Sequence, residues 1–103
     1  MAYAQIISDE VAAKLNAQEN IEVIDVREQD EWNSEHIPQA KHIPLGQLPN
    51  RMSELYPSKE YVMVCRSGAR SGRACDFLSA NGFKVTNMIG GMLGWNGEVK
   101  LGQ

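Results

Sequence analysis

The sequence has little of what marks several classes of protein. Its 103 residues include only two cysteines, which is too few for a disulfide scaffold. Basic residues do not dominate, since ten lysines and arginines stand against thirteen aspartates and glutamates, so we expect no nucleic-acid partner. No apolar run approaches the roughly 20 residues that cross a bilayer, and we expect no membrane association.

The first residues also lack the marks of a secretory signal. Residues 1–8 have no basic stretch and no long apolar core, and Asp9 and Glu10 follow directly. Together with the low cysteine content, this favours a cytoplasmic location in a reducing environment. The length suits one core, and no linker or repeat interrupts the chain, so we expect a single domain over residues 1–103. Without a heptad pattern, a monomer is expected.

What the sequence does contain is an alternation of strand-like and helix-like segments. Apolar runs predict three strands, at 21–26, 61–64 and 84–89. Capped or amphipathic segments predict helices at 8–16, 28–34, 45–55, 71–81 and 92–95. Strands separated by helices predict an α/β fold with a mostly parallel central sheet flanked by helices on both sides. Ligands of such sheets collect at the carboxyl ends of the strands.

The most informative segment is Cys65-Arg66-Ser67-Gly68-Ala69-Arg70-Ser71, which directly follows the apolar run 61–64. It places one thiol where a buried strand ends and a helix begins. Backbone N–H groups of such a short loop can converge on the sulfur, and the helix N-terminus adds positive potential that favours a thiolate. We therefore predict a reactive cysteine in an anion-binding loop, rather than a small apolar residue that closes a strand.

The second cysteine has a different setting. Cys75 lies in the apolar stripe that Ala74 and Leu78 form on the predicted helix, so we interpret it as a buried core thiol. A resolving role in a disulfide with Cys65 is the alternative.

Three further groups of residues have both a structural and a functional interpretation. Asp25 and Arg27 follow an earlier strand, and either could brace the cysteine loop by hydrogen bonding if the two strand ends are neighbours. His36 and His42 have no acidic or cysteine residues at metal-ligand spacing, so we expect structural histidines and no metal. The pair Gly90-Gly91 is a weak phosphate-loop signal, which close backbone packing beside the cysteine loop explains as well.

Four segments of the chain form a pattern when they are taken together. They are Asp25-Val26-Arg27-Glu28, His36-Ile37-Pro38 followed by Ala40, Cys65 to Ser71, and Gly90-Gly91-Met92-Leu93-Gly94-Trp95. In this order they resemble the successive signatures of the single-domain rhodaneses, the thiosulfate sulfurtransferase family, over nearly the whole chain.

This resemblance implies a sulfurtransferase that moves a sulfane sulfur from thiosulfate, or a similar small anionic donor, to cyanide or a thiol, which can belong to a protein. Cys65 would attack the donor and carry the sulfur as a persulfide, without a metal or organic cofactor. The loop would bind the substrate, with its amides on the persulfide and Arg66 and Arg70 on the donor's oxygens. The substrate-binding residues would be Arg66, Ser67, Gly68, Ala69, Arg70 and Ser71.

Two alternatives belong to other functional classes. Phosphatases of the dual-specificity type and arsenate reductases share the logic of a cysteine, a loop and an arginine, but resemble the longer pattern His-Cys-x5-Arg. Here Val64 precedes the cysteine and four residues separate Cys65 from Arg70, a tighter loop that suits a single sulfur. The other alternative is a noncatalytic or regulatory sulfur-relay or binding module, against which the intact cysteine loop argues.

Overall fold

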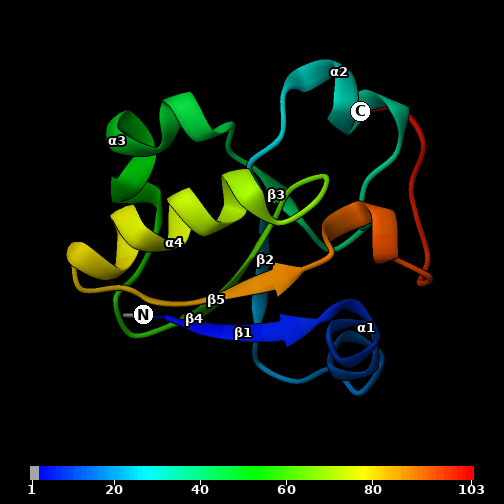
Figure 1. Ribbon diagram of the computed structural model, residues 1–103, viewed down its shortest axis with the longest axis horizontal. Coiled ribbons are helices and arrows are strands. Elements are labelled where there is room, and N and C mark those ends of the chain that lie inside the picture. The colour runs from blue at the N-terminus through cyan, green and yellow to red at the C-terminus, as the bar shows by residue number, and fades with distance from the viewer. Residues whose placement is uncertain (1–2) are drawn as a thin grey trace.

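A computed structural model describes residues 3–103 of the chain. Its centre is a five-stranded sheet in the order β1-β5-β4-β2-β3, in which every neighbouring pair of strands is parallel (Figure 1). The strands are β1 (Ala4–Ile7), β2 (Glu22–Asp25), β3 (Lys41–His42), β4 (Glu60–Val64) and β5 (Lys84–Ile89).

Helical segments connect the strands. The α-helices are α1 (Ser8–Asn16), α2 (Gln29–Ser34), α3 (Leu48–Arg51) and α4 (Ala69–Ala80). Short 3-10 segments are η1 (Leu45–Gln47), η2 (Met52–Glu54) and η3 (Gly91–Gly94). None of the helices within residues 3–103 combines the length and the apolar character needed to cross a membrane.

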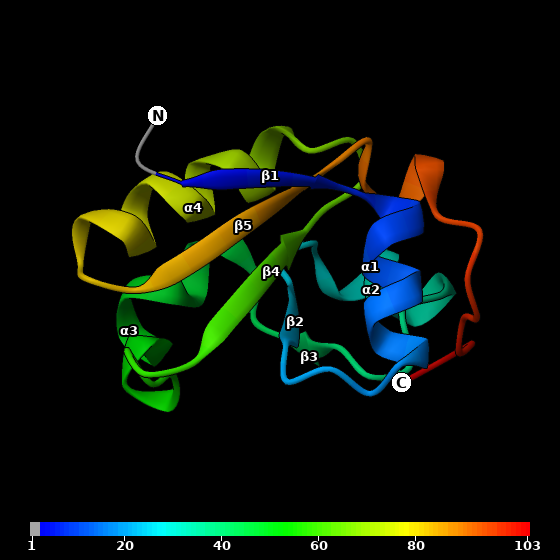
Figure 2. The same cartoon turned by 90° about the horizontal axis from the view of Figure 1, so that it is seen from below.

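Helices cover both faces of the sheet, as the sequence predicts. In Figures 1 and 2, α3 and α4 lie on one side of the strands and α1 lies on the other. Successive side chains of β4 alternate between these faces, so that Met63 packs in the cluster with Leu78 of α4 and Val62 packs in the cluster with Val11 of α1. A strand that is covered twice has an unbroken apolar sequence, which explains the run 61–64.

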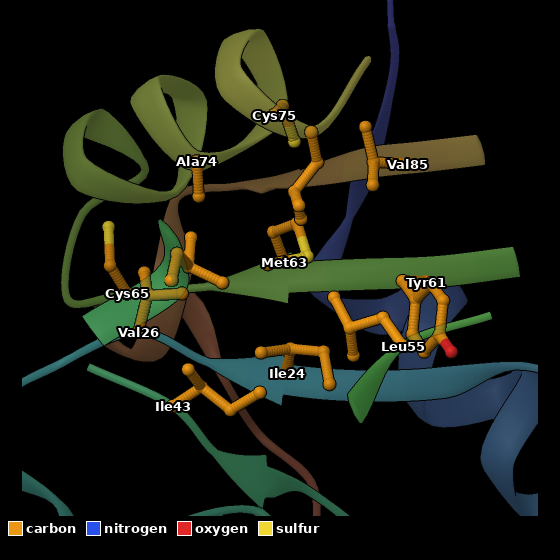
Figure 3. Packing of buried hydrophobic residues seen from close by; sticks show 12 residues of the cluster. Ile24, Val26, Ile43, Leu55, Tyr61, Met63, Cys65, Ala74, Cys75 and Val85 are labelled. Carbon is orange, nitrogen blue, oxygen red and sulfur yellow. The ribbon is translucent and has the colours of Figure 1, made fainter. Parts of the chain in front are cut away.

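Cys75 lies in the cluster beneath α4, and the prediction of a core thiol is confirmed. It is fully buried between the helix and the sheet, further along α4 than the cysteine loop (Figure 3). Both cysteines are free, so the alternative of a disulfide with Cys65 does not describe this structure. Burial raises the pKa of Cys75 to about 12, which keeps it a neutral thiol.

Two expectations about the elements were wrong. Segment 45–55 is broken into η1, α3 and η2 rather than forming one helix, because Pro49 lacks the N–H that would bond the Leu45 carbonyl group. Of the five strands, β1 and β3 were not predicted. The strand β3 has only two residues, which is too short for a pattern. The strand β1 is the longer of the two. It is an edge strand of four residues that are mostly exposed, so it lacks the apolar run by which buried strands are recognised.

The order of the strands fixes where a site can form. From β2 the chain proceeds to β3, toward one edge of the sheet, whereas from β4 it proceeds to β5, toward the opposite edge. The carboxyl ends of β2 and β4 are therefore adjacent to a topological switch point, where parallel sheets bind ligands. Asp25 pairs with Val64 in the register, and the Val26 amide donates to the Val64 carbonyl oxygen at 2.9 Å.

Candidate active site

The loop after β4 turns back on the side chain of its first residue. Gly68 has φ +108°, a left-handed conformation that suits glycine, and it immediately precedes α4. This turn directs the Gly68 amide to Cys65 Sγ, to which it donates at 3.0 Å. In Figure 3 the sulfur points into the curve between β4 and α4. The predicted convergence of a strand end, a loop and a helix start on one thiol is therefore present.

The environment of Cys65 has two opposing effects on its pKa. Only 1% of the residue is exposed, and burial raises the pKa of the thiol. Hydrogen bonds from the Ser71 hydroxyl group and from the amides of Ser71, Gly68 and Ser67 act in the other direction, and the net pKa is lowered. The thiolate is therefore stabilised by neutral protein donors although it lies at the edge of the core.

A double-glycine turn supports the loop from behind. The Met92 amide donates to the Cys65 carbonyl oxygen at 2.9 Å, and the Leu93 amide donates to the Arg66 carbonyl oxygen at 3.0 Å. Gly91 has φ +54°, and a Cβ atom there would lie 2.5 Å from the Cys65 carbonyl oxygen. Close backbone packing beside the cysteine loop therefore explains Gly91. At Gly90 a Cβ atom would have nothing within 4 Å, and it is the φ of +80° that favours glycine there.

The two arginines of the loop have different surroundings. Arg70 forms a bidentate ion pair with Glu31 of α2, with N–O distances of 2.6 and 2.8 Å. Glu31 also accepts the Glu28 amide in a capping box at the start of α2. Arg66, in contrast, is exposed at the rim of the loop, together with Ser67 and Ala69.

Asp25 and Arg27 form a buried ion pair at the end of β2. The Arg27 Nη2 atom lies 2.8 Å from Asp25 Oδ2, and the guanidinium group also donates to the Glu35 carbonyl oxygen at 2.7 Å. Asp25 in turn accepts the Arg27 amide. These bonds hold the segment after β2, which is the neighbour of the cysteine loop, but they do not run to the loop itself.

The two histidines have structural contacts. His36 Nδ1 lies 2.9 Å from the Trp32 carbonyl oxygen, and His42 Nε2 lies 2.7 Å from the Arg27 carbonyl oxygen, so both nitrogens donate. The Trp32 ring is stacked with both imidazoles, with ring centroids 3.5 Å from His36 and 4.8 Å from His42.

Two residues of the site were missed at the level of sequence. Glu31 pairs with Arg70, which lies 39 positions further along the chain. Asn87 of β5 accepts a hydrogen bond from the Ser71 hydroxyl group, with 2.6 Å between Ser71 Oγ and Asn87 Oδ1. In the structure Asn87 is 4% exposed. It had one weak signal, because alternation along the strand places this polar residue on the same face as the apolar Val85. Glu31 had none, since an acidic residue in the first turn of a helix is ordinary.

Comparison with known proteins agrees with this fold and site. The family model of the rhodanese-like domain matches residues 8–98. YtwF of Bacillus subtilis (strain 168), which is named a sulfurtransferase on a provisional basis, is 44% identical over 100 residues that cover 97% of each protein. The thiosulfate sulfurtransferase GlpE of Coxiella burnetii (strain RSA 331) is 33% identical over 96 residues, covering 92% of this chain and 89% of GlpE.

A solved structure extends the agreement to three dimensions. The rhodanese-like domain protein from Staphylococcus aureus matches with a TM-score of 0.91 at 32% identity, covering 97% of this chain and 99% of the other. The chain therefore belongs to the rhodanese-like domain family, a family of sulfurtransferases. The resemblance that its four segments indicate is confirmed.

The Glu31–Arg70 pair predicts a specific dependence of stability on pH. The hydrogen bond from Arg70 lowers the pKa of Glu31 from 4.5 to about 2. Because the folded-state pKa is depressed, the stabilisation is complete above about pH 4.5 and is lost as the pH falls toward 2. We expect Glu31→Gln to reduce the free energy of unfolding by up to about 1 kcal/mol at pH 7, and by progressively less below pH 4.5.

Urea denaturation at a series of pH values measures this difference. Arg70→Ala provides the control, because the pH-dependent effect of Glu31→Gln should be much smaller once its partner is absent, with only the Glu28 amide and the charge of Arg27 left to lower the pKa of Glu31. A difference that stays constant down to pH 2 would contradict the assigned ion pair.

Gly91→Ala should destabilise the protein, because the new Cβ atom would overlap the Cys65 carbonyl group and the residue would have a positive φ. We expect a loss of about 1 to 3 kcal/mol in the free energy of unfolding. Gly46→Ala is the matched control, since nothing lies within 4 Å of a Cβ atom there. Equal stability of the two variants would show that the turn does not pack as described.

Proposed function

We propose that the protein is a thiosulfate sulfurtransferase that carries sulfur as a persulfide on Cys65. The observation that carries this proposal is the set of neutral donors that converges on Sγ, namely the Gly68 amide at 3.0 Å and the Ser71 hydroxyl group at 3.3 Å, with a lowered thiol pKa. A persulfide is a monoanion at neutral pH, and such donors stabilise it without a metal.

In the first half-reaction, the Cys65 thiolate attacks the outer sulfur of thiosulfate. A new S–S bond forms to Sγ, the S–S bond of the donor breaks, and sulfite leaves with the electron pair of that bond. The outer sulfur then carries the negative charge within the loop. The amides of Ser67, Gly68 and Ser71, which lower the thiol pKa, are the main-chain donors that we assign to this charge.

In the second half-reaction, cyanide or the thiolate of an acceptor attacks the outer sulfur. The S–S bond to Sγ breaks, and its electron pair returns to Cys65 as a thiolate, which is stabilised by the same donors. The loop therefore serves first a nucleophile and then a leaving group. Loading and unloading are separate steps, so the kinetics are of the ping-pong type.

The donor's oxygens need cations at the rim of the loop. Arg66 is exposed there, and we assign it the main contact with the sulfonate oxygens. Arg70 contributes its charge to the site, but its hydrogen bonds run to Glu31. The remaining loop residues form the wall around the sulfur.

Loading with thiosulfate tests the proposal directly. We expect incubation with thiosulfate to increase the intact mass by that of one sulfur atom, and mass spectrometry of peptides should locate it on Cys65. Cys65→Ser should abolish the gain and the transfer of sulfur to cyanide. Cys75→Ala is the matched control and should retain both, because Cys75 is a neutral core thiol.

The same experiment distinguishes the alternatives. Absence of a mass increase together with hydrolysis of a phosphate ester would favour the phosphatase. Loading of Cys65 without transfer to cyanide or a small thiol would favour a relay to one protein acceptor.

Arg66→Ala should weaken the use of thiosulfate selectively. A hydrogen bond to a charged group contributes about 1.5 to 3 kcal/mol, so we expect KM for thiosulfate to rise about tenfold or more. The dependence of the second half-reaction on cyanide should stay the same. Arg73→Ala, at another exposed arginine three residues beyond Arg70, is the control. If both variants raise KM equally, the contact between Arg66 and the donor is wrong.

A further inference from the structure

The Ser71 hydroxyl group lies between two acceptors. Its oxygen is 2.6 Å from Asn87 Oδ1 and 3.3 Å from Cys65 Sγ, and the hydroxyl group has one proton to donate. Ser71 is fully buried and Asn87 is 4% exposed, so water does not take the place of either acceptor. The proton can satisfy only one of the two at a time.

The orientation of the Asn87 amide is determined by a second contact. Its Nδ2 atom donates to the Gly68 carbonyl oxygen at 3.1 Å. The flipped amide would instead bring two carbonyl oxygens to this distance without a proton between them. Asn87 Oδ1 is therefore an acceptor and faces the Ser71 hydroxyl group.

We propose that Ser71 and Asn87 form a hydroxyl switch for Cys65. The Ser71 hydroxyl group donates its hydrogen bond to Asn87 while the sulfur is neutral, and to the sulfur when it becomes anionic. Asn87 is a positioning residue in this proposal, because it acts on the sulfur through Ser71. The proposal rests on the proposed function in that it takes Cys65 as the reacting group.

The distances and charges determine the two positions of the switch. With a neutral thiol, the bond to Asn87 is the better one, since 2.6 Å is short for a neutral O–H···O bond and Sγ is a weak acceptor. With a thiolate, the bond to sulfur becomes charge-assisted and roughly twice as strong as a neutral one. The thiol proton leaves to solvent, whereas Ser71 keeps its proton and changes only its acceptor.

The switch has a consequence for reactivity. Competition by Asn87 reduces the net gain that Ser71 gives the thiolate, so the thiolate is stabilised less than Ser71 alone would stabilise it. The intrinsic nucleophilicity of a thiolate falls as its pKa falls, and an overstabilised sulfur attacks slowly. When the outer sulfur of the persulfide carries the charge, Sγ is neutral and the Ser71 hydroxyl group again donates its hydrogen bond to Asn87.

A double-mutant cycle on the Cys65 pKa tests the switch. Loss of the competing acceptor in Asn87→Ala should lower this pKa by about half a unit to one unit. Ser71→Ala should raise it by a similar amount. In the Ser71→Ala background, Asn87→Ala should leave it unchanged. The charged groups near Cys65 are Arg66 and Arg70, the acidic residues Glu28 and Glu31 that act on Arg70, and the Asp25–Arg27 pair at the adjacent end of β2. All of them stay in every variant.

The pKa is measured as the pH dependence of iodoacetamide alkylation at Cys65, located by peptide mass spectrometry. Ser79→Ala on the same helix is the control and should match the wild type, because Ser79 bonds the Asp76 carbonyl oxygen away from the site. Asn87→Leu keeps the branched outline of the side chain without an acceptor, and it decides the outcome if Asn87→Ala does not fold.

Two results overturn the switch. One is a rise of the Cys65 pKa in the Asn87 variants. The other is the same shift with and without the Ser71 hydroxyl group, which would mean that Asn87 acts only by supporting Gly68. No sulfur donor is used, so the outcome is independent of persulfide formation. If the double-mutant cycle gives the expected pKa shifts but thiosulfate does not load Cys65, the proposed function is wrong and the switch stands.

Discussion

The site depends on the hydrogen bonds that main-chain amides donate to one sulfur. Burial alone raises the pKa of a thiol, and Cys75 shows this effect in the core, with a pKa of about 12. Cys65 lies in the same cluster, yet its pKa is lowered. The difference is local geometry, because the left-handed Gly68 aims its amide at Sγ, whereas Cys75 lies within a helix whose amides are already paired. One core cluster therefore holds two thiols whose pKa values are shifted in opposite directions.

Three segments at the carboxyl edge of the sheet support that geometry. β4 delivers Cys65, α4 begins directly after Gly68, and the Gly90-Gly91 turn after β5 brings two amides to the carbonyl groups of Cys65 and Arg66. A side chain at Gly91 would fill the space in which these backbones meet. The parallel order of β5, β4 and β2 is what brings these separate segments to one edge.

The sequence predicts the parts of this arrangement that are local. The strand before Cys65 is recognisable because it is buried on both faces, and the loop is contiguous, so its donors and its thiol can be read together. Asn87 and Glu31 were missed because their partners lie 16 and 39 positions away, and only the folded sheet brings them together. The edge strand β1 was missed for a different reason, since pairing with β5 rather than an apolar run makes it a strand.

The pairing of the arginines also bears on which anion suits the loop. Arg27 is paired with Asp25 and Arg70 with Glu31, so the guanidinium hydrogen bonds of both are already in use, and the donors left for an anion at the sulfur are the loop amides and the exposed Arg66. Amide donors stabilise one localised negative charge well, because they are fixed in place and need no reorganisation. A dianion such as a phosphate ester gains most from free guanidinium groups with bidentate geometry, and Arg70 already spends that geometry on Glu31. The charge distribution therefore supports the persulfide that we propose over a phosphoryl group held inside the loop, for a reason independent of the length of the loop. Dianionic thiosulfate is not disfavoured in the same way, because we place its sulfonate group at the rim, against Arg66.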